Sequence, residues 1–455
     1  MSFKLDNGTD IRAVIPGVDR LAYFQTSGLG LKLQPALDAA WHWMRFQAAG
    51  AAHPDVSARL KAEFEGARRT VAGALGAIAD EIVLGENATI GINIVANGIA
   101  WRPGDQVLLS DEEHPGNLIP WYNMASRHGV RLRFLPLAGN DDARLLQLFG
   151  DMLGQNTRVV SISHVSRRSG RRLPVRRLVD MAHARGVPVL LDGAQAFGAV
   201  PVNVRELDCD FYVFSGHKYI MAPQGTGGFY VRRDRVEWLR PSWVGSHSQS
   251  TMDGQGRLVL HDNARRFEFG TRNLSDSIAF GTALEFWERQ GWRRVFAAIA
   301  AYTDELKAGL KRVPGLRLLT PSEYGESSGI VVFEIPGLEA ALIQSLDEAG
   351  TSGTYIGALA LSAIGSTGAL PRLIDALTDP NRRGHGRRLA KTLARFGDKL
   401  LPPLSRALKA SPEEYSLLAA LEALEQTRPG TIDEFAADRS QNLRTAARLV
   451  RERAG

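Results

Sequence analysis

Two short apolar runs that each end in polar residues place the strongest constraint on the fold of this chain. Val189–Leu191 and Phe211–Phe214 have the length and composition of buried strands. The residues that follow them carry an acid and an amide, then a hydroxyl, an imidazole and an amine: Asp192, Gln195, Ser215, His217 and Lys218. Ligands of open α/β sheets bind at the carboxyl ends of the strands. We therefore expect these five side chains to meet at one edge of a sheet.

This set of side chains suits pyridoxal 5'-phosphate (PLP). A lysine amine forms a Schiff base with the PLP aldehyde, and a carboxylate beside the pyridine nitrogen keeps that nitrogen protonated, so that the ring accepts electrons. Lys218 is the expected amine and Asp192 the expected carboxylate. Gln195 is expected to hydrogen-bond the ring hydroxyl, and Ser215 and His217 to hold the phosphate. A surface lysine and a helix-capping aspartate would explain either residue alone, but not the spacing of the whole set.

Three motifs in this part of the chain closely resemble the class V aminotransferase family of fold-type I PLP enzymes. They are Asp192-Gly-Ala-Gln195, Ser215-Gly-His217-Lys218 and Pro223-Gln-Gly-Thr-Gly-Gly-Phe-Tyr-Val231. The resemblance runs from about Tyr23 to Pro336, and the family includes cysteine desulfurases, isopenicillin N epimerase and C–S lyases. It implies an α/β fold with a three-layer, mostly parallel sheet and a small, possibly truncated, α/β domain.

Length and composition predict more than one domain. At 455 residues, the chain is expected to form two or three domains. The expected segments are an N-terminal segment 1–22, a PLP-binding large domain 23–274, a partial small domain 275–349, and an all-α extension 350–455. Hydrophobic residues make up 44% of the chain, which is enough for a sizeable core.

Charge and cysteine content indicate which classes of partner and which cellular compartment to expect for this chain. The net charge of +6 comes from dispersed arginine clusters, which favour solubility or anionic substrates over nucleic-acid binding. We find no apolar run near the ~18 residues of a membrane span and no signal pattern in the first residues. The one cysteine, Cys209, excludes an internal disulfide and fits a reducing compartment. A cytoplasmic enzyme without a metal site, nucleic acid or membrane partner is expected.

A capped helix is predicted to begin at Asn87, after a short strand. Asn87 is a favourable N-cap, and helix N-termini suit phosphates because they offer unpaired N–H groups and a positive dipole end. The resemblance implies that Ala88 and Thr89 hold the PLP phosphate. A capped helix without a ligand is the alternative.

Two further loops follow predicted strands and carry candidate site residues. The resemblance places His114 stacked on the pyridine ring, while a solvated loop histidine is the alternative. Many family members have asparagine where this chain has Arg167, in a segment with four arginines within six residues. Guanidinium groups bind carboxylates bidentately, although a solvated basic turn is equally compatible. Arg167 and Asn117 are the predicted substrate contacts.

The segment Arg266–Asn273 matches a family segment that reaches the cofactor phosphate of the neighbouring subunit. Thr271 is the residue that the match assigns to that contact. The resemblance therefore implies a homodimer with shared sites.

The chain departs from the family pattern near Gly350. An arginine for the substrate carboxylate is expected in this region, and we find none. Instead, the sequence of 370–377 recurs 31 residues later at 401–408, with helical spacing of Leu and Ala between the copies. Paired helices at this period resemble HEAT-like repeats, which bind protein partners. One ordinary helical cap with coincidental Leu-Pro starts is the alternative.

The predicted reaction is C–S bond lysis of an amino acid, with Lys218 as general base. A free lysine titrates near ~10.4, so burial or nearby positive charge must lower the Lys218 pKa. Cysteine desulfurases need a nucleophilic cysteine in the second domain, and this chain has no cysteine after Cys209. Epimerisation and transamination remain open. A hypothesis of another class is an inactive PLP-fold scaffold that binds a protein through its C-terminal helices.

Overall fold

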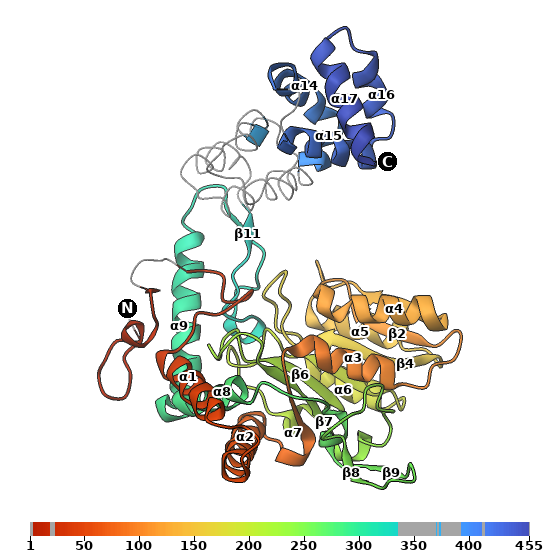
Figure 1. Ribbon diagram of the computed structural model, residues 1–455. Coiled ribbons are helices and arrows are strands. Elements are labelled where there is room, and N and C mark those ends of the chain that lie inside the picture. Colours follow the sequence, from red (N-terminus) through yellow and green to blue (C-terminus); the bar gives the residue numbers. More distant parts are fainter. Residues whose placement is uncertain are drawn as a thin grey trace. The chain divides into compact units, whose positions relative to one another are not determined.

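The computed structural model describes residues 3–18, 23–334, 370, 373–374, 393–411 and 415–454. The chain divides into two compact units, Met1–Glu334 and Ile335–Gly455 (Figure 1). The expected boundaries at residues 22, 274 and 349 remain predictions. The sequence also predicts a helix from Glu339 to Ala349. That helix, and the residues directly after Gly350 where the family pattern is lost, lie outside the described residues.

A seven-stranded sheet forms the centre of the first unit. Its spatial order is β1-β7-β6-β5-β4-β2-β3. The strands are β1 (Ile82–Gly85), β2 (Gln106–Ser110), β3 (Arg131–Leu135), β4 (Thr157–Ser163), β5 (Val189–Asp192), β6 (Phe211–Ser215) and β7 (Gly227–Val231). β7 is antiparallel to both of its neighbours, and all other adjacent pairs are parallel. The predicted mostly parallel α/β sheet is confirmed.

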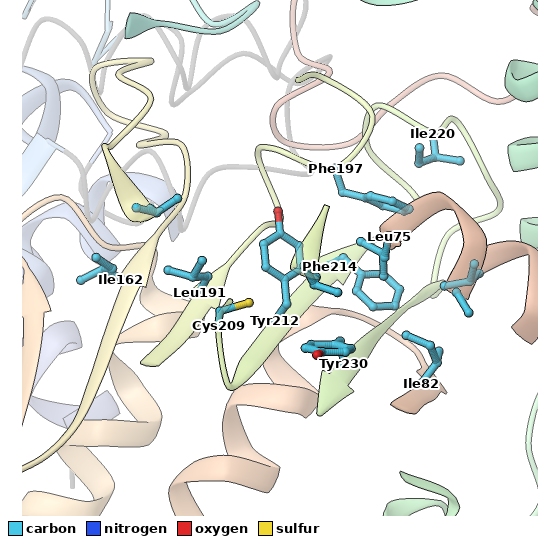
Figure 2. Packing of buried hydrophobic residues seen from close by; sticks show 14 of the residues in the cluster. Leu75, Ile82, Ile162, Leu191, Phe197, Cys209, Tyr212, Phe214, Ile220 and Tyr230 are labelled. Atoms are coloured by element: carbon cyan, nitrogen blue, oxygen red, sulfur yellow. The ribbon is translucent and has the colours of Figure 1, made fainter. Parts of the chain in front are cut away.

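Side chains alternate between the two faces of this sheet and create two separate cores. On β6, Tyr212 and Phe214 point into the core shown in Figure 2, while Phe211 and Val213 point into the opposite core. The first core includes residues of α2 (Pro54–Leu75), α5 (Asp142–Met152), α6 (Val175–His183) and α8 (Leu274–Gln290). The second includes residues of α3 (Ala88–Gly98) and α4 (Ile119–His128). Helices on both faces of the sheet give the three expected layers.

The sequence predicts helical structure from Pro35 to about Leu75 and from Ser275 to about Val313, and a glycine divides each stretch into two helices. The first forms α1 (Gln34–Ala48) and α2, separated at Gly50, whose φ is 127°. The second forms α8 and α9 (Trp292–Leu310), separated at Gly291, whose φ is 79°. Glycine reaches such positive φ values without the steric cost that other residues incur.

The smaller elements of the first unit are short. They are α7 (Val204–Leu207), the hairpin of β8 (Gln249–Met252) with β9 (Leu258–Leu260), and the pair of β10 (Arg317–Leu318) with β11 (Phe333–Glu334). The sequence predicts a strand from Gly329 to Pro336, and within the described residues the strand covers Phe333–Glu334.

The described part of the second unit is helical. It contains α14 (Leu401–Ala410), α15 (Tyr415–Thr427), α16 (Thr431–Ala437) and α17 (Gln441–Ala454), which share one buried cluster of Leu, Ala, Phe and Val side chains. The expected helical extension is confirmed. The first copy of the proposed repeat, 370–377, falls mostly outside the described residues, so the HEAT-like assignment and its protein partner remain predictions. Among the described residues, we find no helix long and apolar enough to cross a bilayer.

A buried ion pair fixes the segment that precedes α8. Arg68 of α2 is fully buried, and its Nη1 and Nη2 donate to Glu268 Oε1 and Oε2 at 2.5 and 3.0 Å. Glu268 Oε1 also accepts the amide of Leu84 in β1 at 3.2 Å, and Arg272 is a further partner of this carboxylate. Burial alone would raise the Glu268 pKa, but the charge and hydrogen bonds of Arg68 and the charge of Arg272 lower it on balance.

Glu268→Gln should lower the free energy of unfolding by about 3 kcal/mol, because it leaves the buried Arg68 guanidinium without its main counter-charge. Urea unfolding followed by tryptophan fluorescence measures the change. Since the folded pKa lies below that of the unfolded chain, the wild-type advantage should persist at neutral pH and disappear as the pH falls through the folded pKa.

Glu63→Gln is the matched control for this variant. Glu63 pairs with Arg59 at 2.7 Å on the exposed face of the same helix. An exposed pair of this kind contributes at most about 1 kcal/mol. Equal destabilisation by the two variants would contradict the structural role given to Glu268.

Candidate active site

A cavity of about 440 Å³ opens where β5 and β6 end. Its volume lies in the range of small-molecule sites. It brings together nine of the predicted residues: Ala88, Thr89, His114, Arg167, Asp192, Gln195, Ser215, His217 and Lys218. Gln25, Ser27, Gly28 and Arg168 also line it, although they were not among the predicted site residues. The family resemblance implies that the segment Tyr23–Gly30 lies near the cofactor, and Arg168 belongs to the arginine-rich segment after β4.

Lys218 and Asp192 are both buried in this cavity. Burial lowers the Lys218 pKa, the negative charge of Asp192 opposes this, and the positive charge of Arg167 lowers it further. Burial likewise raises the Asp192 pKa, against the effects of the Ala194 amide and Lys218. The Ala194 N–H donates to Asp192 Oδ1 at 2.9 Å. The amine is therefore biased toward its neutral, nucleophilic form, and the carboxylate lacks a full counter-charge.

The backbone of Lys218 is held by the segment that precedes α1. The Gly30 amide donates to the His217 carbonyl at 2.8 Å, and the Leu33 amide donates to the Met221 carbonyl at 3.1 Å. A Cβ on Gly30 would lie 2.0 Å from the Lys218 carbonyl oxygen, so only glycine fits there. Lys32 Nζ donates to the same His217 carbonyl at 3.2 Å. This contact fixes the direction from which the Lys218 side chain enters the cavity.

The N-terminus of α3 borders the cavity, as predicted for phosphate binding. Asn87 is the N-cap, and its side chain accepts from the Ile90 amide at 3.2 Å. The first helical residues, Ala88 and Thr89, therefore present their N–H groups at the dipole's positive end. Ser215 lines the same cavity at the end of β6.

The tautomer of His217 limits how it can bind a phosphate. His217 Nδ1 lies 3.0 Å from the Thr226 carbonyl oxygen and must carry the proton of that hydrogen bond. Nε2 of the neutral ring is then an acceptor. Burial and the nearby charges of Lys218 and Lys32 lower the His217 pKa. Binding to a phosphate oxygen through Nε2 requires the imidazolium, so a bound phosphate would have to raise that pKa.

His114 is held as a neutral ring at the end of β2. Its Nδ1 accepts from the Gly116 amide at 2.9 Å, and burial, with the charges of Lys218 and Arg167, lowers its pKa to about 4. The adjacent Glu113 is buried and accepts the Ser163 amide and hydroxyl at 2.9 and 2.6 Å. A neutral imidazole on a fixed loop is suited to stacking on a flat ring.

Two predicted site residues lie outside this cavity. Asn117 is fully buried, donates to Glu113 Oε2 at 2.8 Å and accepts the Ser161 hydroxyl at 2.6 Å. These bonds use its amide to fix the His114 loop, and its assignment as a substrate contact remains a prediction. Thr271 lines a separate cavity of about 480 Å³ together with Arg272 and Leu274. Its predicted contact with a neighbouring subunit remains a prediction.

The donor set fits PLP. Asp192 forms no ion pair within the described residues, so a protonated pyridine nitrogen would supply the positive charge that this buried carboxylate lacks. Lys218 would hold the aldehyde, and the N-terminus of α3 with Ser215 would hold the phosphate. Gln195 Nε2 donates to the Ser27 carbonyl at 2.9 Å and its Oε1 accepts the Tyr219 hydroxyl at 3.1 Å, which orients the amide beside this space.

Arg167 and Asp192 are the charged groups that affect the Lys218 pKa, and their removal should shift that pKa in opposite directions. In the PLP-free protein, Arg167→Gln removes a positive neighbour and should move the midpoint of the pH profile for PLP capture to higher pH. Asp192→Asn should move it to lower pH. The growth rate of the visible absorption band on adding PLP measures both. Arg144→Gln, on the exposed face of α5, should leave the midpoint in place, and shifts of equal sign would contradict the assignment.

Comparisons with known proteins agree with this geometry. The family model for aminotransferase class V matches residues 22–353. A cysteine desulfurase of Escherichia coli O157:H7 is 34% identical over 356 residues, which cover 74% of this chain and 84% of the relative. A cysteine desulfurase of Synechococcus elongatus is 31% identical over 344 residues, covering 72% of this chain and 53% of the relative. The chain thus spans about half the length of the latter.

Solved structures resemble the same part of the chain. The C–S lyase C-DES with glycine covalently linked to its PLP cofactor is 29% identical, with a TM-score of 0.70, covering 75% of this chain and 90% of that protein. A second C-DES structure, described as a cystine C–S lyase with its product cysteine persulfide, has a TM-score of 0.69. A family match over most of the chain, together with this cavity, shows that the chain belongs to the class V aminotransferase family of PLP-dependent enzymes.

Proposed function

We propose that this protein is a PLP-dependent C–S lyase that acts on a cysteine-type amino acid without forming a persulfide on its own chain. The observation that carries this proposal is the position of Cys209, the one cysteine in the sequence. Cys209 is buried before the first residue of β6, and Lys218 follows the last. The five residues of β6 lie between Cys209 and Lys218 and span roughly 16 Å. The thiol is therefore at the opposite end of the strand from Lys218.

The chemistry of Cys209 supports the same conclusion. Burial raises the pKa of its thiol, and the negative charge of Asp210 raises it further. The thiolate is the nucleophilic form of cysteine, so a buried thiol with a raised pKa is inert. A sulfur atom cut from the substrate would therefore have to leave with a product. C-DES, which is described as a cystine C–S lyase with cysteine persulfide as product, is a relative with that property.

The site residues divide the reaction among them. PLP, when bound, would accept the electron pair left at the substrate α-carbon. Lys218 Nζ would remove the α-proton, and its lowered pKa favours the neutral amine needed for this step. Asp192 would keep the ring nitrogen protonated, and His114 would cover one face of the ring. Arg167 would bind the α-carboxylate. Loss of the β-thiol group would then yield pyruvate and ammonia after hydrolysis.

Lys218→Ala should lower pyruvate release from S-alkyl cysteines by roughly 10²–10⁴-fold, as for the loss of a general base. Cys209→Ala should keep the wild-type rate, since the thiol takes no part. Lactate-dehydrogenase-coupled pyruvate detection, with the released thiol measured in parallel, checks both variants. Loss of activity in a folded Cys209→Ala protein would contradict the proposal. Racemised or transaminated amino acid without pyruvate would favour the epimerase or aminotransferase alternatives.

We further infer that a second copy of this chain covers an apolar cavity of about 540 Å³ beside the N-terminus of α3. Its lining includes Thr89, Ile94, Trp243 and Phe269. Trp243 and Phe269 stack at 5.6 Å although they are 67% and 40% exposed. Exposed aromatic pairs of this kind are characteristic of interfaces. Phe269 is two residues from Thr271, so the same contact would bring Thr271 toward the site of the partner subunit.

Trp243→Lys should convert a dimer to monomers and weaken PLP binding, because a charge replaces the apolar contact and Thr271 leaves the phosphate of the partner. Light scattering and PLP titration measure the two effects. Met252→Lys, on the exposed hairpin at β8, is the control and should change neither. A wild-type protein that is monomeric at micromolar concentration would refute the shared site.

A further inference from the structure

We propose that the loop 166–172 recognises substrates with two anionic groups: Arg167 binds the α-carboxylate, and Arg168 binds a second anion carried on the sulfur substituent. This inference rests on the proposed function, because it names the substrate class of the same cavity. Both arginines line the cavity that contains Lys218 and Asp192.

The two guanidinium groups have no carboxylate partner within the described residues. Arg171 of this loop is used differently: it donates to Asp142 at 2.7 Å and to the Asn140 carbonyl at 2.6 Å, as a structural contact. Glu112 is the acid in contact with the loop, but its Oε2 accepts the hydroxyls of Ser166 and Ser169 instead. Arg167 and Arg168 therefore remain available to a ligand.

Hydrogen bonds hold the backbone of this loop in a fixed position. The Ser166 hydroxyl accepts the Arg168 amide at 3.1 Å, and the Gly170 amide donates to the Ser166 carbonyl at 2.9 Å. Gly170 has a φ of 71°, and a Cβ there would lie 2.3 Å from the Ile330 carbonyl oxygen. The Thr320 hydroxyl donates to the Ser169 carbonyl at 2.7 Å. Because the backbone is anchored on both sides, the loop loses little entropy when its side chains bind an anion.

The charges that line the cavity would favour a substrate with more than one anion. With PLP bound, Asp192 would pair with the ring nitrogen, and the N-terminus of α3 would hold the phosphate. His114 is neutral, since its pKa is about 4. Two guanidinium groups remain, and an ordinary amino acid offers one carboxylate. A second anion on the substrate would balance the other.

The charge of Arg167 lowers the pKa values of both Lys218 and His114. Because the α-carboxylate of the substrate must lie beside the reacting centre, we assign it to Arg167. Arg168 lines the same cavity, and we assign to it the anion beyond the sulfur atom.

A matched pair of substrates tests this inference on the PLP-loaded enzyme. S-carboxymethyl-L-cysteine and S-carbamoylmethyl-L-cysteine have almost the same shape and differ in one negative charge. Titration of the cofactor absorption band gives a Kd for each, and pyruvate release gives kcat/KM. We expect the carboxylate to bind roughly 10–100-fold more tightly, as for a charged hydrogen bond. Leaving-group chemistry alone would favour the electron-withdrawing amide, so it cannot produce this preference.

Variants of the two arginines show which residue produces the preference for the carboxylate ligand. Arg168→Gln should reduce the carboxylate-to-amide ratio of Kd values toward one, whereas Arg167→Gln should weaken both ligands and keep most of the ratio. Arg144→Gln, outside the cavity, should preserve the wild-type values. Equal Kd values for the two ligands in the wild type would overturn the inference, even if both release pyruvate. A charge preference without pyruvate release would support it and refute the lyase activity, and no spectral shift with either ligand would overturn both.

Discussion

The parallel pairing of β5 with β6 is the constraint on which the site depends. In this register, Asp192, the last residue of β5, lies opposite Val213, and β6 continues for two more residues to Ser215. Adjacent strands are about 4.8 Å apart, and each continues directly into polar residues. An acid from one strand and an amine from the next therefore enter one cavity. The two apolar cores keep this register, because a slip by one residue would turn Tyr212 and Phe214 away from their core.

Burial gives the site its chemistry. The same desolvation that biases Lys218 toward a neutral amine leaves Asp192 without a full counter-charge and keeps His114 neutral. Each of these states is unfavourable or incomplete in the protein alone, and each matches one part of the PLP ring system. The protein thus stores part of its free energy in a set of groups that its cofactor completes, as is common where pKa values are perturbed by function.

Local sequence predicted the parts of the site that follow strands or begin a helix. Asp192, Ser215 and Lys218 come directly after apolar runs, and Asn87 caps the helix as its chemistry required. Contacts between segments that are far apart in the sequence leave no such local pattern. Gly30 meets the backbone of Lys218, and Arg68 meets Glu268 across 200 residues. The partners of Asn117 are of the same kind, since Glu113 and Ser161 become neighbours only when β2 and β4 pair.

The loop 166–172 is a part of the cavity in which this chain differs from many members of its family. The family resemblance leads us to expect asparagine at the position of Arg167 in many relatives, whereas this chain carries two guanidinium groups at the cavity itself. Glu112 fixes the loop through Ser166 and Ser169 and does not neutralise either arginine. If both anions of the substrate bind here, recognition lies wholly within Met1–Glu334. Substrate selection would then require no side chain from Ile335–Gly455, and the sequence of that unit would be free to diverge from the family pattern.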